Sequence, residues 1–510
     1  MSKTKSPTMH SLYLSSTNTI LQALKVGQRF LQPLPPGSGD ALVLAELAKC
    51  SSKCVIVFCT DPLDAQRLSH EIPLFGPELT VQQFPDWETL AYDSFSPHED
   101  LISARLKALN ALLNNEVNVL TIPVSTALYR LAPPSFLAAH SFSFKQGEKL
   151  DEKQLKEQMV LANYNHVTQV TAPGEFSIRG GLIDLFPMGS VLPYRLDLFD
   201  DEIESIRAFD ADSQRSLYPV KKIDLLPGRE FPLTEEARHT FRANFREYFE
   251  GDPSRALPYK EIGNGVAFAG VEYYLPLFFE QTATLFDYLP SDSLLVTHGM
   301  LPLAIQSFHQ DTLQRYHFLK SDPERPVLAP EHLFLDENDF FTALKDFARL
   351  DLQAKDLHPD FTPVPNVAVT RRAEDPLSAL RTEIRDPSRR TLLCAESAGR
   401  RETIAQMLAE HNLAPDPNCL ELDAFLSGNS AFALIHAPIT QGFALKDNAI
   451  TLLTENDLYP HQVRTTQRAR RNQRNNVEAM VKDLSELRPG DPVVHTGHRA
   501  LSRLSGNGFG

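Results

Sequence analysis

Residues 173–187 read Pro-Gly-Glu-Phe-Ser-Ile-Arg-Gly-Gly-Leu-Ile-Asp-Leu-Phe-Pro, and residues 194–207 read Tyr-Arg-Leu-Asp-Leu-Phe-Asp-Asp-Glu-Ile-Glu-Ser-Ile-Arg. Short runs of alternating apolar residues between Gly, Pro and Asp turns are typical of an antiparallel β-meander. Phe176 belongs to the apolar pleat, and Arg179 precedes Gly180, where the backbone can approach closely. A turn is predicted at Asp200-Asp201. We therefore expect a compact α+β domain at residues 125–245.

The second of these runs places charged residues on one face of a strand. Side chains alternate between the faces of a strand, so Arg195 and Asp197 share one face while Leu196 and Leu198 share the other. If the apolar face is buried, Arg195 and Asp197 form an outward surface of mixed charge, which suits a protein partner. The alternative is an ordinary solvated strand face.

The flanking sequence alternates between helical and strand patterns. We expect a helix at residues 40–49 and a buried strand at 54–59. A second helix follows, with Asp61 as its cap and Pro62 at its first position. A third helix is expected at 101–114 and a strand at 117–122. This order predicts an open α/β sheet. A helix at 234–250 and a strand at 293–297 suggest a return to that sheet, which makes the middle domain an insertion.

We therefore expect an α/β multidomain fold. Residues 1–124 and 246–349 would form the first domain, 125–245 the insertion, and 350–459 a small α/β domain that begins with a linker at 350–369. A basic linker helix at 460–487 and the start of a further domain at 488–510 would follow.

Composition narrows the class of protein. The chain has 510 residues and a net charge of −15, which argues against a surface that neutralises many phosphates. An apolar run long enough to span a membrane is missing, as is a secretory signal, and five cysteines cannot form a disulfide framework in a chain of this length. We expect a cytoplasmic monomer.

Three further motifs have residue types that could bind a ligand. In Pro36-Gly-Ser-Gly-Asp40, an aspartate stands where a phosphate loop needs its lysine, so we expect a helix cap and no nucleotide, cofactor or metal site. The aromatic run at 84–98 lacks Arg and Lys, so packing is favoured over base stacking. Arg464, Arg468 and Arg471 line one side of the basic helix, where they could contact nucleic acid or acidic domains of the same chain. We find no constellation of catalytic residues.

Several of these motifs, in this order, resemble the transcription-repair coupling factor (Mfd) family. The matching segments are residues 85–90, 93–98, 174–181, 184–190 and 199–207, and the resemblance extends from about residue 15 to 495. It implies a module similar to the repair protein UvrB with a worn-down nucleotide site, whose inserted domain binds UvrA. The implied UvrA contacts are Phe176, Arg179, Gly180, Arg195 and Asp197; a further basic position would fall at Asn165, beside His166.

The resemblance also implies parts that this sequence lacks: most of an RNA-polymerase-binding domain, and motor domains that use ATP and Mg²⁺ to translocate on DNA. Residues 488–495 look like the opening of the polymerase-binding domain, but 496–503 depart from the family pattern. A frameshift near residue 496 would explain the departure, and the alternative frame of the coding DNA tests it.

The expected function is a non-enzymatic adaptor in nucleotide excision repair that recruits UvrA to RNA polymerase stalled at a lesion, with DNA contacted weakly or only through the missing motor. The alternatives are a nucleotide-dependent UvrB-type helicase, which nucleotide binding would reveal, and a stand-alone DNA-binding module based on the basic helix.

Overall fold

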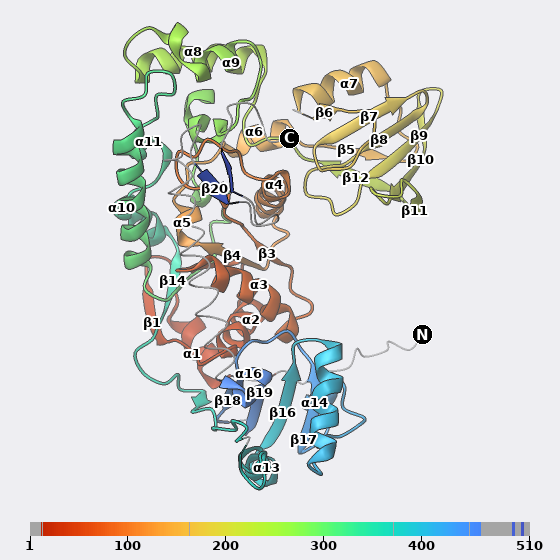
Figure 1. The fold of residues 1–510 in the computed structure, drawn as a ribbon, viewed down its shortest axis with the longest axis vertical. Coiled ribbons are helices and arrows are strands. Elements are labelled where there is room, and N and C mark those ends of the chain that lie inside the picture. The colour runs from red at the N-terminus through yellow and green to blue at the C-terminus, as the bar shows by residue number, and fades with distance from the viewer. Residues whose placement is uncertain are drawn as a thin grey trace.

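The computed structural model describes residues 12, 14–162, 164–370, 372–447 and 449–460, together with short strands at 492–494 and 501–503. In this part of the chain, the body is elongated (Figure 1). A β-rich domain lies beside one end of the body, and a small α/β domain lies at the opposite end. The expected basic helix, with Arg464, Arg468 and Arg471, and most of residues 488–510 lie outside the described residues.

The centre of the body is a parallel sheet with helices on both of its faces. Its strand order is β1-β14-β13-β2-β4-β3, and every adjacent pair is parallel. Strands β2, β4 and β13 are buried along their whole length, as parallel strands between helical layers are. The bounds are β1 (Arg29–Pro33), β2 (Val55–Cys59), β3 (Val81–Gln83), β4 (Val119–Pro123), β13 (Leu294–His298) and β14 (Ala348–Gln353).

The helices expected beside this sheet are present. The side chain of Asp61 accepts the N–H of Leu63 at the start of α3, which confirms the predicted cap. The strand expected at 293–297 is β13, and its pairing with β2 confirms the return to the first sheet. The helices of this part are α1 (Ser15–Ala23), α2 (Gly39–Ser51), α3 (Pro62–Phe75), α4 (Glu99–Leu113), α5 (Val124–Ala127), α6 (Pro134–Ala139), α10 (Leu301–Leu319), α11 (Pro330–Leu333), α12 (Glu337–Ala343) and the 3₁₀ turn η4 (Leu344–Asp346).

A helical extension lies at the end of the body opposite the small α/β domain (Figure 1). Phe241 and Phe245 of α8 are buried against the ring of Phe278 and the ring of Tyr259, respectively. Its elements are α8 (Glu235–Tyr248), η1 (Pro253–Arg255), α9 (Leu257–Gly263), η2 (Val271–Phe278) and η3 (Leu285–Tyr288).

The inserted domain is the predicted meander. Consecutive strands β7 to β11 pair antiparallel, β6 joins β7 in parallel, and Asp200 takes a left-handed conformation (φ 54°) in the expected turn. A separate antiparallel pair, β5 and β12, joins the start of the domain to its end. The bounds are β5 (Phe142–Lys145), α7 (Glu152–Leu161), β6 (Asn165–His166), β7 (Glu175–Arg179), β8 (Leu182–Leu185), β9 (Tyr194–Phe199), β10 (Glu202–Phe209), β11 (Ser216–Val220) and β12 (Lys222–Leu225).

The third domain is a mixed sheet of order β15-β18-β19-β16-β17 flanked by helices. Its elements are β15 (Phe361–Thr362), α13 (Ser378–Arg385), β16 (Arg390–Ala395), α14 (Ala398–Glu410), α15 (Leu422–Ser427), β17 (Phe432–His436), β18 (Phe443–Leu445), β19 (Ile450–Thr454) and α16 (Glu455–Leu458). The strands β20 (Pro492–Val494) and β21 (Leu501–Arg503) pair antiparallel with each other.

Three expected boundaries fall inside elements that belong together. Residues 350–353, expected to begin a linker, are part of β14 in the first sheet, and 361–362 already belong to the third sheet. The boundary at 245 cuts α8, which packs on the helical extension. Because α5 and α6 pack on elements of the first domain, the insertion begins at β5.

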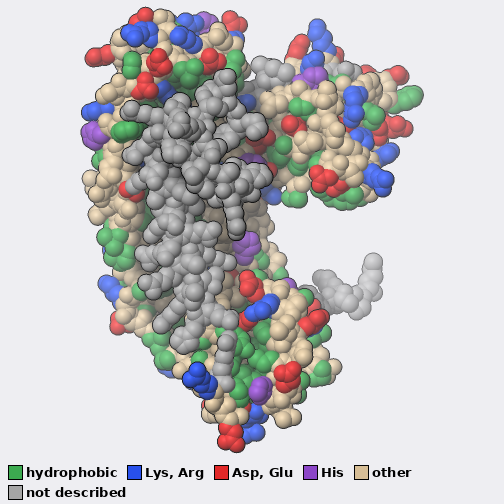
Figure 2. Space-filling model, viewed as in Figure 1, with side chains coloured by type: hydrophobic (Ala, Val, Ile, Leu, Met, Phe, Trp, Pro, Cys, Tyr) green, Lys and Arg blue, Asp and Glu red, His purple; other side chains and the backbone are tan. Residues whose placement is uncertain are grey.

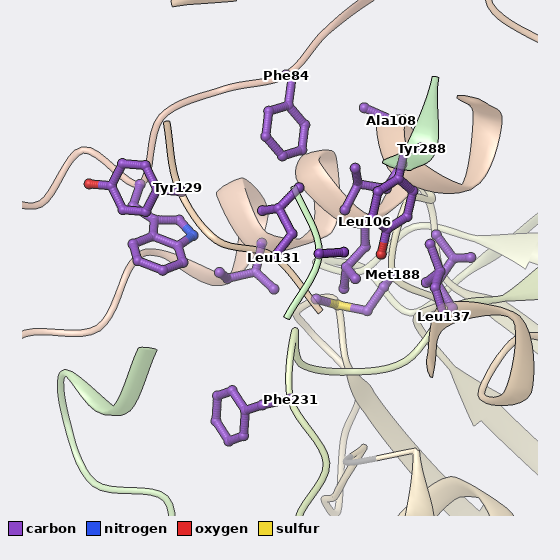
Figure 3. Close-up of a cluster of buried hydrophobic side chains, with 14 of the residues drawn as sticks. Phe84, Leu106, Ala108, Tyr129, Leu131, Leu137, Met188, Phe231 and Tyr288 are labelled. Atoms are coloured by element: carbon purple, nitrogen blue, oxygen red, sulfur yellow. The ribbon is translucent and has the colours of Figure 1, made fainter. Parts of the chain in front are cut away.

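Most of the aromatic run at 84–98 is packed, as predicted, although Phe95 is 68% exposed. Phe84 and Trp87 are buried, and the Trp87 indole N–H donates to Glu230 at 2.9 Å. Figure 3 shows Met188 of the inserted domain among side chains of the body such as Leu106 and Leu137. The hydrophobic core therefore continues from the body into the base of the inserted domain. Among the residues that the structure describes, we find no helix long and apolar enough to cross a membrane.

Candidate protein-interaction face

Three of the predicted contact residues, Arg179, Arg195 and Asp197, meet on one face of the inserted sheet. Register pairs Arg179 with Leu182, Asp184 with Arg195, and Asp197 with Ser205, so these side chains point the same way. We call this surface the interaction face; its members are Ser177, Arg179, Leu182, Asp184, Arg195, Asp197, Ser205 and Arg207. The inserted domain projects from the body, and basic and acidic side chains lie along its outer edge in Figure 2.

A buried carboxylate holds the two arginines. Asp184 is 1% exposed; it accepts two hydrogen bonds from Arg195, at 2.6 and 2.8 Å, and one from Arg179 at 2.6 Å. These charge-assisted bonds are the strong kind, and the two from Arg195 are bidentate. The hydrogen bond to Asp184 raises the pKa of Arg195 further above its already high value, so this guanidinium is always charged.

The two arginines differ in how much of their side chains is exposed to solvent. The side chain of Arg195 is 20% exposed, and its guanidinium also lies over the ring of Phe209, 4.9 Å from the centroid. The side chain of Arg179 is 54% exposed, so much of its guanidinium faces solvent. Arg195 is thus a fixed charge at the base of the face, and Arg179 is a charge that a partner can reach.

The acidic part of the face is centred on Asp197, two residues after Arg195 on β9. Asp197 accepts a hydrogen bond from the Ser205 hydroxyl at 2.7 Å and lies 3.5 Å from the Arg207 guanidinium. Leu182 pairs with Asp197 and is 38% exposed, and Phe199 at the end of β9 is 70% exposed. The face therefore offers positive, negative and apolar contacts side by side, which is the composition of a protein-binding surface.

Two of the predicted contact residues, Phe176 and Gly180, lie outside the interaction face. Phe176 is fully buried, with its ring 5.0 Å from that of His166, so the expectation that Phe176 touches a partner is wrong: its strand position turns it into the core. Gly180 has φ +62° in the β7–β8 turn, and a Cβ there would meet no atom within 4 Å. Gly180 shapes the turn beside Arg179 and leaves open space above it.

Sequence reasoning missed part of the face. Ser205 and Arg207 lie on β10 and join the face only through the pairing of β10 with β9. Alternation along 202–209 would have grouped them, but register between strands decides which group they meet. Asn165, where a further basic residue was expected, and His166 lie exposed on the edge strand β6.

Among the residues that the structure describes, no group of three or more His, Cys, Asp and Glu side chains could hold a metal ion. His98, in the aromatic run, accepts the N–H of Asp100 at the start of α4.

Comparison with known proteins agrees with this division of the chain. Residues 142–231 match the UvrB interaction domain family, and residues 384–458 match the family described as MFD, D3 domain. The first match covers the inserted domain and its interaction face. The chain thus belongs to the class of proteins that carry a UvrB-type interaction domain on an α/β body.

Longer matches specify the family. The chain is 39% identical over 492 residues to the transcription-repair-coupling factor of Escherichia coli (strain K12), which covers 95% of this chain and 42% of that protein. It is 37% identical over 477 residues to the one from Haemophilus influenzae, covering 91% and 41%. The match to the Bacillus subtilis protein is 23% over 496 residues, covering 91% and 40%. More than nine-tenths of this chain is therefore similar to transcription-repair coupling factors, and the chain spans about two-fifths of the length of these relatives.

Proposed function

We propose that this chain is the adaptor portion of a transcription-repair coupling factor and that its interaction face binds UvrA. The observation that carries the proposal is the pair of arginines fixed by Asp184 within the segment that matches the UvrB interaction domain. Fixed guanidinium groups lose little side-chain entropy when a partner binds, which favours a carboxylate-bearing surface on the other protein.

In the whole protein, the adaptor would bring UvrA to an RNA polymerase stalled at a lesion, and an ATP-driven translocase would act on the polymerase. For this chain itself we propose a non-catalytic role without a nucleotide or metal. The first sheet would then be a degenerate helicase-like domain, because Asp40 stands at the lysine position of the phosphate loop.

The test is binding of purified UvrA to the full chain and to Arg179→Glu/Arg195→Glu. We expect affinity to fall at least about 100-fold, since each reversed charge removes an attraction and adds a repulsion at the centre of the surface. The matched control is Lys149→Glu/Lys222→Glu, which makes the same charge change at exposed positions of the same domain.

Arg179→Glu alone separates binding from folding, because Asp184 keeps its two bonds from Arg195 in that variant. It should weaken UvrA binding while the domain stays folded. Equal affinity of the unmodified chain, the double variant and the control would disprove the assignment of this face.

A further inference from the structure

The turn Pro36–Asp40 leads into α2 as a phosphate loop leads into its helix. In a working loop, backbone N–H groups at the helix start hold phosphate oxygens. Here Asp40 is 2% exposed, and its carboxylate accepts the N–H of Ala41 at 2.7 Å. A carboxylate of the chain itself therefore accepts a backbone N–H at the start of α2.

The Asp40 carboxylate is kept ionised by two neighbours. Burial alone would raise the pKa of Asp40, but hydrogen bonds with Arg67 and His298 lower it to about 2. The Arg67 guanidinium donates to both carboxylate oxygens, at 2.6 and 2.9 Å, and His298 Nε2 lies 2.9 Å away. The ionised Asp40 carboxylate, paired with Arg67, therefore occupies the place where a phosphate loop presents its lysine.

A segment of the third domain covers the same turn. The Ser38 N–H donates to the Gln441 carbonyl at 3.1 Å, and the Gln441 N–H donates back to the Ser38 hydroxyl at 3.3 Å. The backbone N–H and hydroxyl of Thr440 both donate to Glu71, at 2.9 and 2.8 Å. Arg67 donates to Glu71 as well, at 2.8 Å, so the ionic network crosses from one domain to the other.

The fit between the two domains is close. A Cβ at Gly37 would overlap the Gly442 carbonyl, and a Cβ at Gly39 would overlap the ring of Phe361. Neither position has room for a side chain, so the third domain is seated on the turn at backbone contact distance.

We propose that Thr440–Gly442 is a built-in plug of this turn. The Gln441 carbonyl takes the position that a phosphate oxygen takes in a nucleotide-binding loop, and the network through Asp40, Arg67 and Glu71 fastens the third domain to the first. The two domains then move as one body, and any ligand of the turn would have to displace the third domain.

Hydrogen exchange of the full chain tests the plug. Gly37→Ala places a methyl group against Gly442, and we expect at least about tenfold faster exchange in peptides that contain Ser38 and 440–442. The control is Gly147→Ala, which also puts a side chain at positive φ (+85°) but meets no atom within 4 Å. The control should leave the exchange of both segments unchanged.

A second variant guards against a general folding defect in Gly37→Ala. Thr440→Val keeps the side-chain volume and removes the hydroxyl that donates to Glu71. The loss of one hydrogen bond to a charged group should speed exchange at Ser38 about tenfold. Unchanged exchange at Ser38 and 440–442 in both variants would overturn the proposal.

Discussion

Asp184 is nearly invisible from solvent, yet two arginines of the interaction face take their positions from it. Strand alternation predicted Arg195 and Asp197 as outward residues, and the family resemblance added Arg179. It did not reveal Asp184 as their anchor, because the anchor is defined by pairing between β8 and β9. Alternation is a local property, whereas a shared carboxylate requires the register of the sheet.

Asp184→Asn should therefore loosen the face without a change of shape. Removing the charge leaves Arg195 without its carboxylate partner, at a cost of about 2 kcal/mol to the local stability of the sheet. Hydrogen exchange in β7 to β9 should become about 30-fold faster. Exchange at the rate of the unmodified chain would mean that the arginines do not depend on Asp184.

Glu272, in η2, makes the stability depend on pH. Burial raises its pKa from 4.5 to about 7, although it accepts a hydrogen bond from Ser96. Because the folded value is the higher one, the native state holds a proton that the unfolded chain has lost between these two values. Stability from this group is complete below pH 4.5 and falls as pH rises toward 7.

Glu272→Gln should remove this loss, because the amide can accept the Ser96 bond without a charge. We expect a gain of up to about 3 kcal/mol at pH 8 and little gain at pH 4. Thermal midpoints of both proteins at the two pH values check this, and an equal shift at both would contradict the assigned titration.

At the scale of elements, local patterns predicted what local chemistry controls. The cap at Asp61, the meander and the strand β13 follow from residues near in sequence. The boundaries failed where distant packing decides. The end of β14 was assigned to a linker because residues 350–369 are rich in Asp and Pro, although Ala348, Leu350 and Leu352 alternate with polar residues along the strand. The Thr297 hydroxyl on the neighbouring strand donates to Asp351, a partner that sequence cannot supply.

Glu230 joins three parts of the molecule: α4, the loop at 85–87 and the chain that leaves the inserted domain. It accepts hydrogen bonds from Trp87 at 2.9 Å and from the fully buried Arg105 at 2.8 Å. Glu230→Gln leaves the Arg105 charge buried without a counterion, which should cost about 3–5 kcal/mol.

The chain's single tryptophan reports on this change directly, since Trp87 is itself part of the junction. We expect the urea midpoint of Trp87 fluorescence to fall in Glu230→Gln. The comparison variant is Glu247→Gln, which makes the same chemical change on the exposed side of α8 and should leave the midpoint in place.

At the scale of the molecule, the first and third domains share one hydrophobic core. Phe443 of the third domain contacts Phe75 of α3 and Phe361, with ring centroids 5.9 and 5.8 Å apart. Sequence analysis placed a small α/β domain here but treated it as separate, because shared burial depends on which surfaces meet.

Phe443→Ala should therefore destabilise both domains together. Loss of the buried ring is expected to cost about 3–5 kcal/mol and to lower the urea midpoint reported by Trp87, although Trp87 belongs to the first domain. A Trp87 transition that stays in place while the third domain unfolds earlier would show that the two domains fold independently.

The pairing of β5 with β12 has a consequence for how such chains can be rearranged. The inserted domain enters at Phe142 and leaves at Leu225, and these two residues are direct neighbours across an antiparallel ladder. The segment between them leaves the body and returns to the same point, and it touches the body at its base through residues such as Met188. Another domain whose ends lie next to each other could therefore replace this segment. The resulting protein would bind the partner of the new domain, and the sheet of the body would stay unchanged.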